Sequence, residues 1–426
     1  MSMFKRLALA TAVSGVALGL VGCDDDDTSK DTRGSAELRV IHASVDAPAV
    51  DVFIDGSESI SDLDFAESSG FASLFEGTYD IDVQANTPSG NLSVLTVNDF
   101  ALAADASPTV IAVGDVAADT LEVIVVDETT ADPMSDEVGL VVVHGSSAAP
   151  AVDIFLTGPN DDITGAAPAF NFAFKDSVDA GAVSADEVRI RAAVNGTVVY
   201  DSGTVDLSPF AGSKIMVVAV AAENDVESSA SPIKLLAVTD DAQVELAAAG
   251  TQAGIRVAHI SPDAASAAGG PVEVFATSEA LGADPVEVID AFDYLDVLPS
   301  TSTYLEVPQG GYVFDVAPNT DMIGDSVFTT GTVELMAGME YTAIAAGRVT
   351  SSPMFTILPT GDMNRSIATQ ASVKVVHAAP AAGDVDVYVT AAGEFTADQV
   401  AAGTAGDPLL DEFAFPTITD YVALAP

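Results

Sequence analysis

Apolar and polar residues alternate along much of the chain after residue 36, which is the pattern of half-buried β-strands. The segment TYDIDVQA places Tyr79, Ile81 and Val83 on one face and three polar residues on the other. A period of two is typical of a strand with one buried face. No helical periodicity of useful length follows the N-terminal segment, so the pattern predicts an all-β protein.

Other strands are short apolar runs, and they come in pairs. They read TVIAVGDV with TLEVIVVD, IMVVAVAAE with IKLLAVTDD, and YTAIAAGRV with MFTILPTGD. Each complete repeat of the chain holds about seven short strands separated by turns, which predicts an antiparallel β-sandwich of immunoglobulin-like size.

One arrangement occurs four times along the chain, and each repeat carries a single histidine. The histidines are His42, His144, His259 and His377. Their spacings of 102, 115 and 118 residues are those of whole modules in series. A Pro/Ala/Ser turn follows each histidine, and then a strand in which an acid lies between two aliphatic residues. These acids are Asp51, Asp153, Glu273 and Asp386.

The repeats predict a chain of tandem modules joined by short segments of polar or small residues. Residues 1–22 are a signal peptide, 23–36 a lipidated acidic spacer, 37–128 module 1, 138–243 module 2, 253–360 module 3 and 371–426 module 4. Module 4 lacks the closing strands, so it is incomplete or part of a longer chain. A half-sandwich exposes strand edges, and we expect it to be poorly ordered unless something covers it.

The first 23 residues, MSMFKRLALATAVSGVALGLVGC, predict export and lipid anchoring. Two basic residues precede an apolar run that ends in small residues, which is typical of a secretory leader. The ending Leu-Val-Gly-Cys resembles a bacterial lipobox, and the resemblance implies cleavage before Cys23 and lipidation of its thiol. Cys23 is the only cysteine of the sequence, whereas exported proteins usually use cysteines in disulfides.

Four aspartates, 24 to 27, follow the cysteine and predict a solvated spacer. An aspartate directly after a lipidated cysteine resembles the inner-membrane retention signal of enteric bacteria. Because that rule varies between bacteria, the choice of membrane stays open.

The chain carries 64 acidic and 14 basic residues, a formal net charge of −50. Such a surface repels phosphate, so nucleic acid is excluded as a partner. The same charge favours a soluble, monomeric chain, and salt would screen its self-repulsion.

The pattern R-V-x-H-x-S-x-D-A-P-x-V-D-V-F/Y, closest in residues Arg39 to Phe53, resembles a family of bacterial envelope modules, domain of unknown function 4397. Module 2 departs at Gly145, module 3 has an insertion before Val272, and module 4 has Ala379 in place of the serine. The resemblance implies a secreted or lipid-anchored β-rich protein, and it brings no established activity and no catalytic residues.

Three hypotheses compete for the histidine. His42, Ser44 and Asp51 are the residue types of a nucleophilic triad, but residues two apart in a strand lie about 6.6 Å apart, beyond hydrogen-bond reach. One histidine per module makes a poor zinc or copper site, so we predict no metal or cofactor there. A calcium site of loop carboxylates near residues 160–162 stays open as an alternative. The favoured hypothesis is structural: the ring bonds the backbone of the next turn or the carboxylate of Asp51.

Together these features predict a protein of the bacterial cell envelope, attached to the membrane through Cys23 on its periplasmic or outer side. Its role would be non-catalytic, in structure, adhesion or the binding of an envelope protein or glycan. A calcium-dependent carbohydrate binder or an envelope hydrolase is the alternative.

Overall fold

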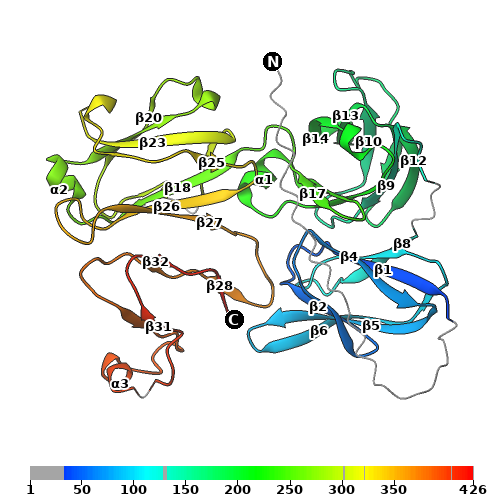
Figure 1. The fold of residues 1–426 in the computed structure, drawn as a ribbon, viewed down its shortest axis with the longest axis horizontal. Coiled ribbons are helices and arrows are strands. Elements are labelled where there is room, and N and C mark those ends of the chain that lie inside the picture. Colours follow the sequence, from blue (N-terminus) through cyan, green and yellow to red (C-terminus); the bar gives the residue numbers. More distant parts are fainter. Residues whose placement is uncertain (1–32, 128–131, 301–302, 321, 404, 426) are drawn as a thin grey trace. The chain divides into compact units, whose positions relative to one another are not determined.

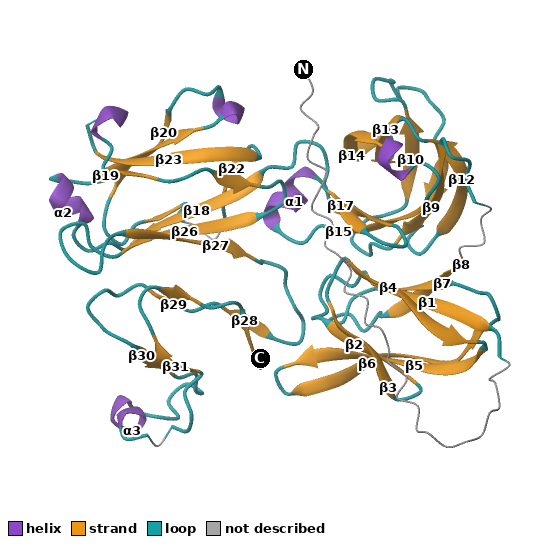
Figure 2. Cartoon of the chain, in the orientation of Figure 1, coloured by secondary structure: helices purple, strands orange, loops and turns teal. Residues whose placement is uncertain are grey.

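A computed structural model describes residues 33–127, 132–300, 303–320, 322–403 and 405–425 (Figure 1). Strands and loops make up nearly all of this structure, and its helices are short (Figure 2). The prediction of an all-β protein of tandem sandwiches is confirmed. Cys23, the leader and most of the acidic spacer lie outside the described residues.

Module 1 is a sandwich of two four-stranded sheets. The first has the order β4-β1-β7-β8 and the second β3-β2-β5-β6. The strands are β1 (Ser35–His42), β2 (Val50–Ile54), β3 (Ser57–Leu63), β4 (Glu67–Phe75), β5 (Gly77–Thr87), β6 (Gly90–Leu102), β7 (Pro108–Val113) and β8 (Glu122–Asp127). Side chains that alternate along β1, β2 and β5 fill the space between the sheets with Leu38, Val52 and Ile81.

Module 2 repeats this arrangement with sheets β12-β9-β15-β16-β17 and β11-β10-β13-β14. Its strands are β9 (Glu137–His144), β10 (Val152–Thr157), β11 (Phe170–Phe172), β12 (Ser177–Ser184), β13 (Glu187–Val194), β14 (Thr197–Asp206), β15 (Lys214–Ala221), β16 (Ile233–Val238) and β17 (Gln243–Leu246). Two short helices accompany them, η1 (Ser208–Phe210) and α1 (Asp225–Ala230).

Module 3 has sheets β21-β18-β26-β27, with β22 also on β18, and β20-β19-β23-β24, with β25 also on β23. Its strands are β18 (Ala253–His259), β19 (Val272–Thr277), β20 (Val286–Phe292), β21 (Val297–Leu298), β22 (Leu305–Val307), β23 (Gly310–Pro318), β24 (Phe328–Thr329), β25 (Val333–Leu335), β26 (Glu340–Ala346) and β27 (Thr356–Asp362). Its short helices are α2 (Ala264–Ala268), η2 (Glu279–Leu281) and η3 (Ile323–Asp325).

One strand pair in each sandwich is parallel. The histidine-bearing strand pairs in parallel with the strand that begins the closing apolar pair: β1 with β7, β9 with β15, and β18 with β26. A parallel pair requires a long crossover connection. The intervening strands of the second sheet supply it, so the pair is a consequence of a topology that local patterning does not reveal.

Module 4 consists of two-stranded ribbons in place of a sandwich. The paired strands are β28 with β33, β29 with β32, and β30 with β31. Their bounds are β28 (Ala371–Val373), β29 (Val376–His377), β30 (Val385–Val387), β31 (Leu410–Phe413), β32 (Thr417–Ile418) and β33 (Val422–Leu424), with α3 (Ala397–Ala401) between them. That this segment is poorly ordered stays a prediction.

Modules 1 and 2 belong to one compact unit, which also includes Asn364–Ala371, and Gln252–Met363 belongs to a second. Within the first unit the two modules share a continuous apolar core, which we call the seam. Its buried residues are Ile41, Ala43, Phe65, Ala66, Ile111, Val113, Ile124 and Val126 of module 1, and Val141, Val143, Met216, Val218, Val220, Ala221, Leu236 and Val238 of module 2. The seam explains why β7, β9, β15 and β16 are apolar on both faces: one face packs inside the sandwich and the other against the neighbouring module.

Candidate functional site

The repeated histidine ends the first strand of each module, where it contacts the turn that follows. In module 1 the backbone N–H of Ser44 donates to Nδ1 of His42 at 3.2 Å, and Nε2 of the ring lies 3.1 Å from the carbonyl oxygen of Pro48. Because Nδ1 accepts, Nε2 carries the proton and donates to Pro48. The neutral ring therefore bonds the backbone of the turn through both of its nitrogens, and its partner is the turn and not Asp51.

The same contact recurs in modules 2 and 4. Nε2 of His144 lies 3.2 Å from the carbonyl oxygen of Pro150, and Nε2 of His377 lies 2.7 Å from that of Gly383. In all three modules the acceptor is six residues after the histidine. We infer that the histidine stabilises the turn and is repeated because the module is repeated. Module 3 departs from this pattern, because Nε2 of His259 has no hydrogen-bond partner among the described residues.

Burial keeps the rings of His42, His144 and His259 neutral. His42 is buried, and desolvation lowers its pKa to about 4 despite the opposing effect of its hydrogen bond with Pro48. Burial also lowers the pKa of His144 and of His259. A general base works best with a pKa near the operating pH, so these rings are poorly matched to acid–base catalysis at neutral pH.

The candidate triad of module 1 is not assembled. The hydroxyl of Ser44 donates to the carboxylate of Asp46 at 3.3 Å, and only its backbone N–H contacts His42. Asp51 is bonded elsewhere, since it accepts from the backbone N–H of Asp62 at 2.8 Å. The arrangement lacks the nucleophile-to-base hydrogen bond that such catalysis requires.

The acids at the equivalent positions of modules 2, 3 and 4 also bond neighbouring segments. Asp153 accepts from the side chain of Asn171, Glu273 from the backbone of Met322, and Asp386 from the backbone of Glu412, at 2.8, 3.3 and 2.9 Å. These bonds hold adjacent strands and turns together. The structure thus brings none of the four acids to a histidine of its own module.

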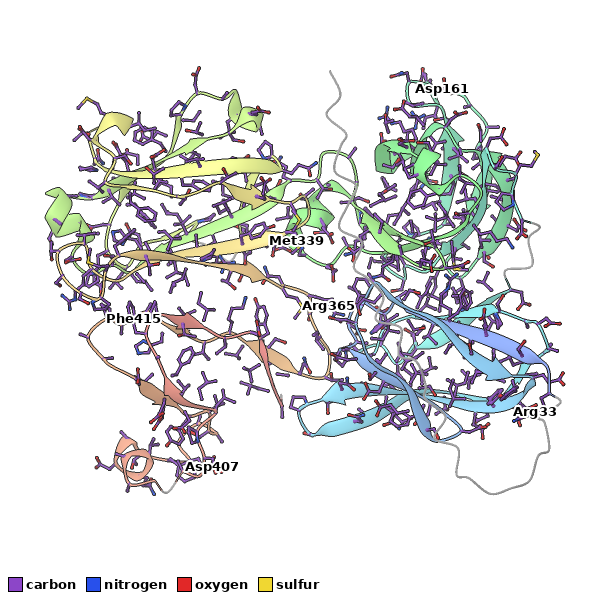
Figure 3. All side chains as sticks on the ribbon, viewed as in Figure 1. Arg33, Asp161, Met339, Arg365, Asp407 and Phe415 are labelled. Atoms are coloured by element: carbon purple, nitrogen blue, oxygen red, sulfur yellow. The ribbon has the colours of Figure 1, made fainter. Side chains whose placement is uncertain are left out.

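The acidic loop proposed as a calcium site has its carboxylates engaged in its own turn. Asp161, labelled in Figure 3, accepts from the backbone N–H of Gly158 at 2.9 Å. Asp162 accepts from both the backbone N–H and the hydroxyl of Thr164, and these bonds lower its pKa. Such bonds are typical of a carboxylate that stabilises a loop.

A buried lysine lies at the edge of the seam within a cluster of three carboxylates. Lys234, on β16, has its Nζ 2.5 Å from Glu223, 3.7 Å from Glu227 and 2.6 Å from Glu245. The three carboxylates are close enough together to hold a metal ion, but the lysine ammonium already forms ion pairs with all three. Burial alone would lower the pKa of Lys234, but the three carboxylates outweigh it and raise this pKa.

Arg365 extends this cluster from a distant part of the sequence. Its guanidinium donates to the carbonyl oxygen of Ala47 at 2.8 Å and forms an ion pair with Asp64 at 2.6 Å (Figure 3 labels Arg365). It lies 5.3 Å from the ring centre of Phe65, and the ammonium of Lys234 lies 5.6 Å from the same ring. The segment Asn364–Ala371, which leads from the strands of module 3 to those of module 4, is therefore bound to module 1 through Arg365.

Sequence reasoning missed Lys234, Phe65 and Arg365. The available signal was the lysine itself: basic residues are scarce in this chain, and Lys234 interrupts the apolar run IKLLAV. A charged residue in a buried strand requires partners. Those partners come from segments far away in the sequence, so no local spacing points to them.

The fold and these turns define a class, the tandem β-sandwich protein whose repeated polar residues bond its own backbone and strands. A family model described as domain of unknown function (DUF4397) matches residues 36–155 and 265–388, more than half of the chain. The chain belongs to this family, as its sequence pattern indicated. A search of curated proteins found no match.

Two solved structures from Bacteroides are similar over about half of the chain. A "putative cell adhesion protein" from Bacteroides ovatus is 10% identical, with a TM-score of 0.19, and the match covers 55% of this chain and 98% of the other. A protein of the same description from Bacteroides fragilis is 9% identical, with a TM-score of 0.14, covering 54% and 98%.

Proposed function

We propose that the protein is a lipid-anchored, non-catalytic component of the bacterial cell envelope that holds its β-sandwich modules outside the cytoplasm to bind a partner. One observation carries the proposal: the histidines of modules 1, 2 and 4 and the acids repeated in all four modules bond the modules' own backbone and strands. Residues that bond the scaffold serve the fold, which leaves loops and outer faces for recognition.

The charge of the chain limits the chemistry of that partner. A net charge of −50 favours a partner with a basic or neutral surface and slows approach to anionic ones. An envelope protein or a neutral glycan fits this condition. In the described residues, nothing favours the calcium-dependent binder or the hydrolase over this role, because the loop acids and the triad residues are engaged otherwise.

The anchor is proposed from the sequence, in which Cys23 follows an apolar leader and precedes four aspartates. Among the described residues, no helix is both long and apolar enough to span a membrane.

Replacing the lipidation site tests the anchor. In cells that express the full chain, we expect the wild type to sediment with membranes and to carry the mass of an acylated N-terminus at Cys23. The Cys23→Ser variant loses the acyl chains that provide stable anchoring and moves to the soluble fraction. Ser29→Ala, in the same spacer, is the matched control and stays with the membranes. A soluble wild type without acyl mass would contradict the proposal.

A further inference from the structure

Module 3 contains a cavity of about 500 Å³ between its two sheets, whereas the corresponding space of module 2 holds about 50 Å³. We propose that this cavity binds one neutral long-chain aliphatic molecule with an oxygen acceptor at one end. The volume lies within the range of natural ligand sites. It also far exceeds the small voids of an ordinary protein interior.

The three sandwiches share one topology, so their inner positions can be compared through the parallel strand pair. Val40 pairs with Val110 in module 1, Val142 with Val217 in module 2, and Val257 with Ala343 in module 3. The smaller side chain of Ala343 lines the cavity. The apolar core of module 3 also forms two separate clusters, around Tyr312 and around Phe292. The cavity is therefore a property of this module and not of the fold.

The walls are almost entirely apolar and come from both sheets. They include Ile255, Val274, Val288, Phe314, Val316 and Ile357. Water in a cavity requires two to four polar partners, which such walls do not supply. A hydrocarbon chain matches these apolar walls, because its binding removes apolar surface of both the ligand and the cavity from water.

His259 provides one polar group on this wall. Its Nδ1 accepts from the backbone N–H of Ser261 at 3.4 Å, which leaves the proton on Nε2. The residue six positions on is Ala265, which lies in α2 and whose carbonyl oxygen accepts from the N–H of Gly270. The insertion that forms α2 has thus removed the acceptor that the other modules provide. A buried donor without a partner is costly, and a ligand oxygen would satisfy it.

The surroundings of His259 select a neutral polar end over an anionic one. The loop that contains Asp293 and Asp296 packs on this histidine: the N–H of His259 donates to the carbonyl oxygen of Asp296 at 2.9 Å. The carboxylates of both aspartates act electrostatically on the ring. A carboxylate ligand would be repelled there, so an alcohol or ester oxygen is favoured over a fatty acid.

The full chain is titrated with N-phenyl-1-naphthylamine, a neutral apolar dye that fluoresces in apolar sites; the chain has no tryptophan to interfere. We expect saturable binding at one site per chain, displacement by 1-hexadecanol, and displacement by hexadecanoate about tenfold weaker. No saturable binding by the wild type would overturn the proposal, whatever the variants do. If hexadecanoate displaces the dye as well as or better than 1-hexadecanol does, the proposed neutral polar end of the ligand is wrong.

Three variants locate the site. Ala343→Phe fills the cavity and lowers dye affinity by about tenfold or more. Ile344→Val, on the opposite face of the same strand and outside the lining, retains it. His259→Phe keeps the ring volume, so it binds the dye as before but binds hexadecanol about tenfold more weakly. Circular dichroism checks that each variant is folded. The assignment would be contradicted if a folded Ala343→Phe protein bound the dye with wild-type affinity. It would also be contradicted if the His259→Phe protein bound hexadecanol as tightly as the wild type does.

Discussion

Replacing Lys234 with alanine lowers the free energy of unfolding of modules 1 and 2 by about 3 to 5 kcal/mol, the range for a buried ion pair that loses one partner. The side chain of Lys234 is 1% exposed, and its ammonium lies within hydrogen-bond distance of Glu223 and Glu245. Its removal leaves three carboxylates, including the mostly buried Glu227, to repel one another next to the seam. Hydrogen exchange of peptides from β15 and β16 measures the change in this unit directly.

Lys214 provides the matched control in the same module. It pairs with Asp132 at 3.1 Å, but that carboxylate is 94% exposed. A pair of this kind contributes about 1 kcal/mol or less, so Lys214→Ala has a small effect. Equal effects of the two substitutions would show that the Lys234 cluster does not stabilise the seam.

Acidification destabilises the same unit between about pH 6.5 and pH 4. The pKa of His42 falls from an ordinary 6.5 in the unfolded chain to about 4 in the folded one. In this window the unfolded state binds the proton more tightly, so stability decreases as pH falls and the decrease ends below both pKa values. The full effect of His42 is about 3 kcal/mol, and His144 contributes in the same direction.

Two variants separate this effect from the titration of carboxylates. His42→Gln lacks the titrating ring, so its stability changes less over the window than that of the wild type. Arg365 lowers the pKa of His42 through its charge, so Arg365→Gln raises that pKa. NMR titration of the His42 ring gives its pKa in the wild type and in Arg365→Gln, and urea unfolding at several pH values gives the stability of the wild type and of both variants. A wild-type His42 that titrates near 6.5 would refute the buried, neutral ring.

The sequence predicted the architecture well where the signal is local. Alternation in β5 and the repeated histidine strands indicated half-buried strands and whole modules, because side-chain period and turn residues act within a few positions. The seam was not predicted, although PTVIAV and KIMVVAVA are nearly continuous apolar runs, which the structure buries along both faces. An apolar run of this kind indicates that both faces of a strand are buried, but it does not identify the segment that packs against each face.

The sequence failed where structure depends on distant segments. The parallel pairing of β1 with β7 joins residues about 70 positions apart in the same sheet. Arg365 reaches Asp64 across some 300 residues, so no spacing rule could connect them. The insertion before Val272 was visible, but its effect on His259 required the position of the Ala265 carbonyl group.

The role of the histidines and carboxylates as scaffold is tested most directly by thermal melts of the full chain with Ca²⁺, with Zn²⁺ and with a chelator, at matched ionic strength. Because these groups bond the protein itself, we expect melting temperatures that agree within about 1 °C across the three conditions. An ion bound at a hundred times its Kd would add about 2.7 kcal/mol and raise the melting temperature by several degrees. Such a rise with Ca²⁺, reversed by the chelator, would contradict the scaffold role and favour calcium-dependent binding.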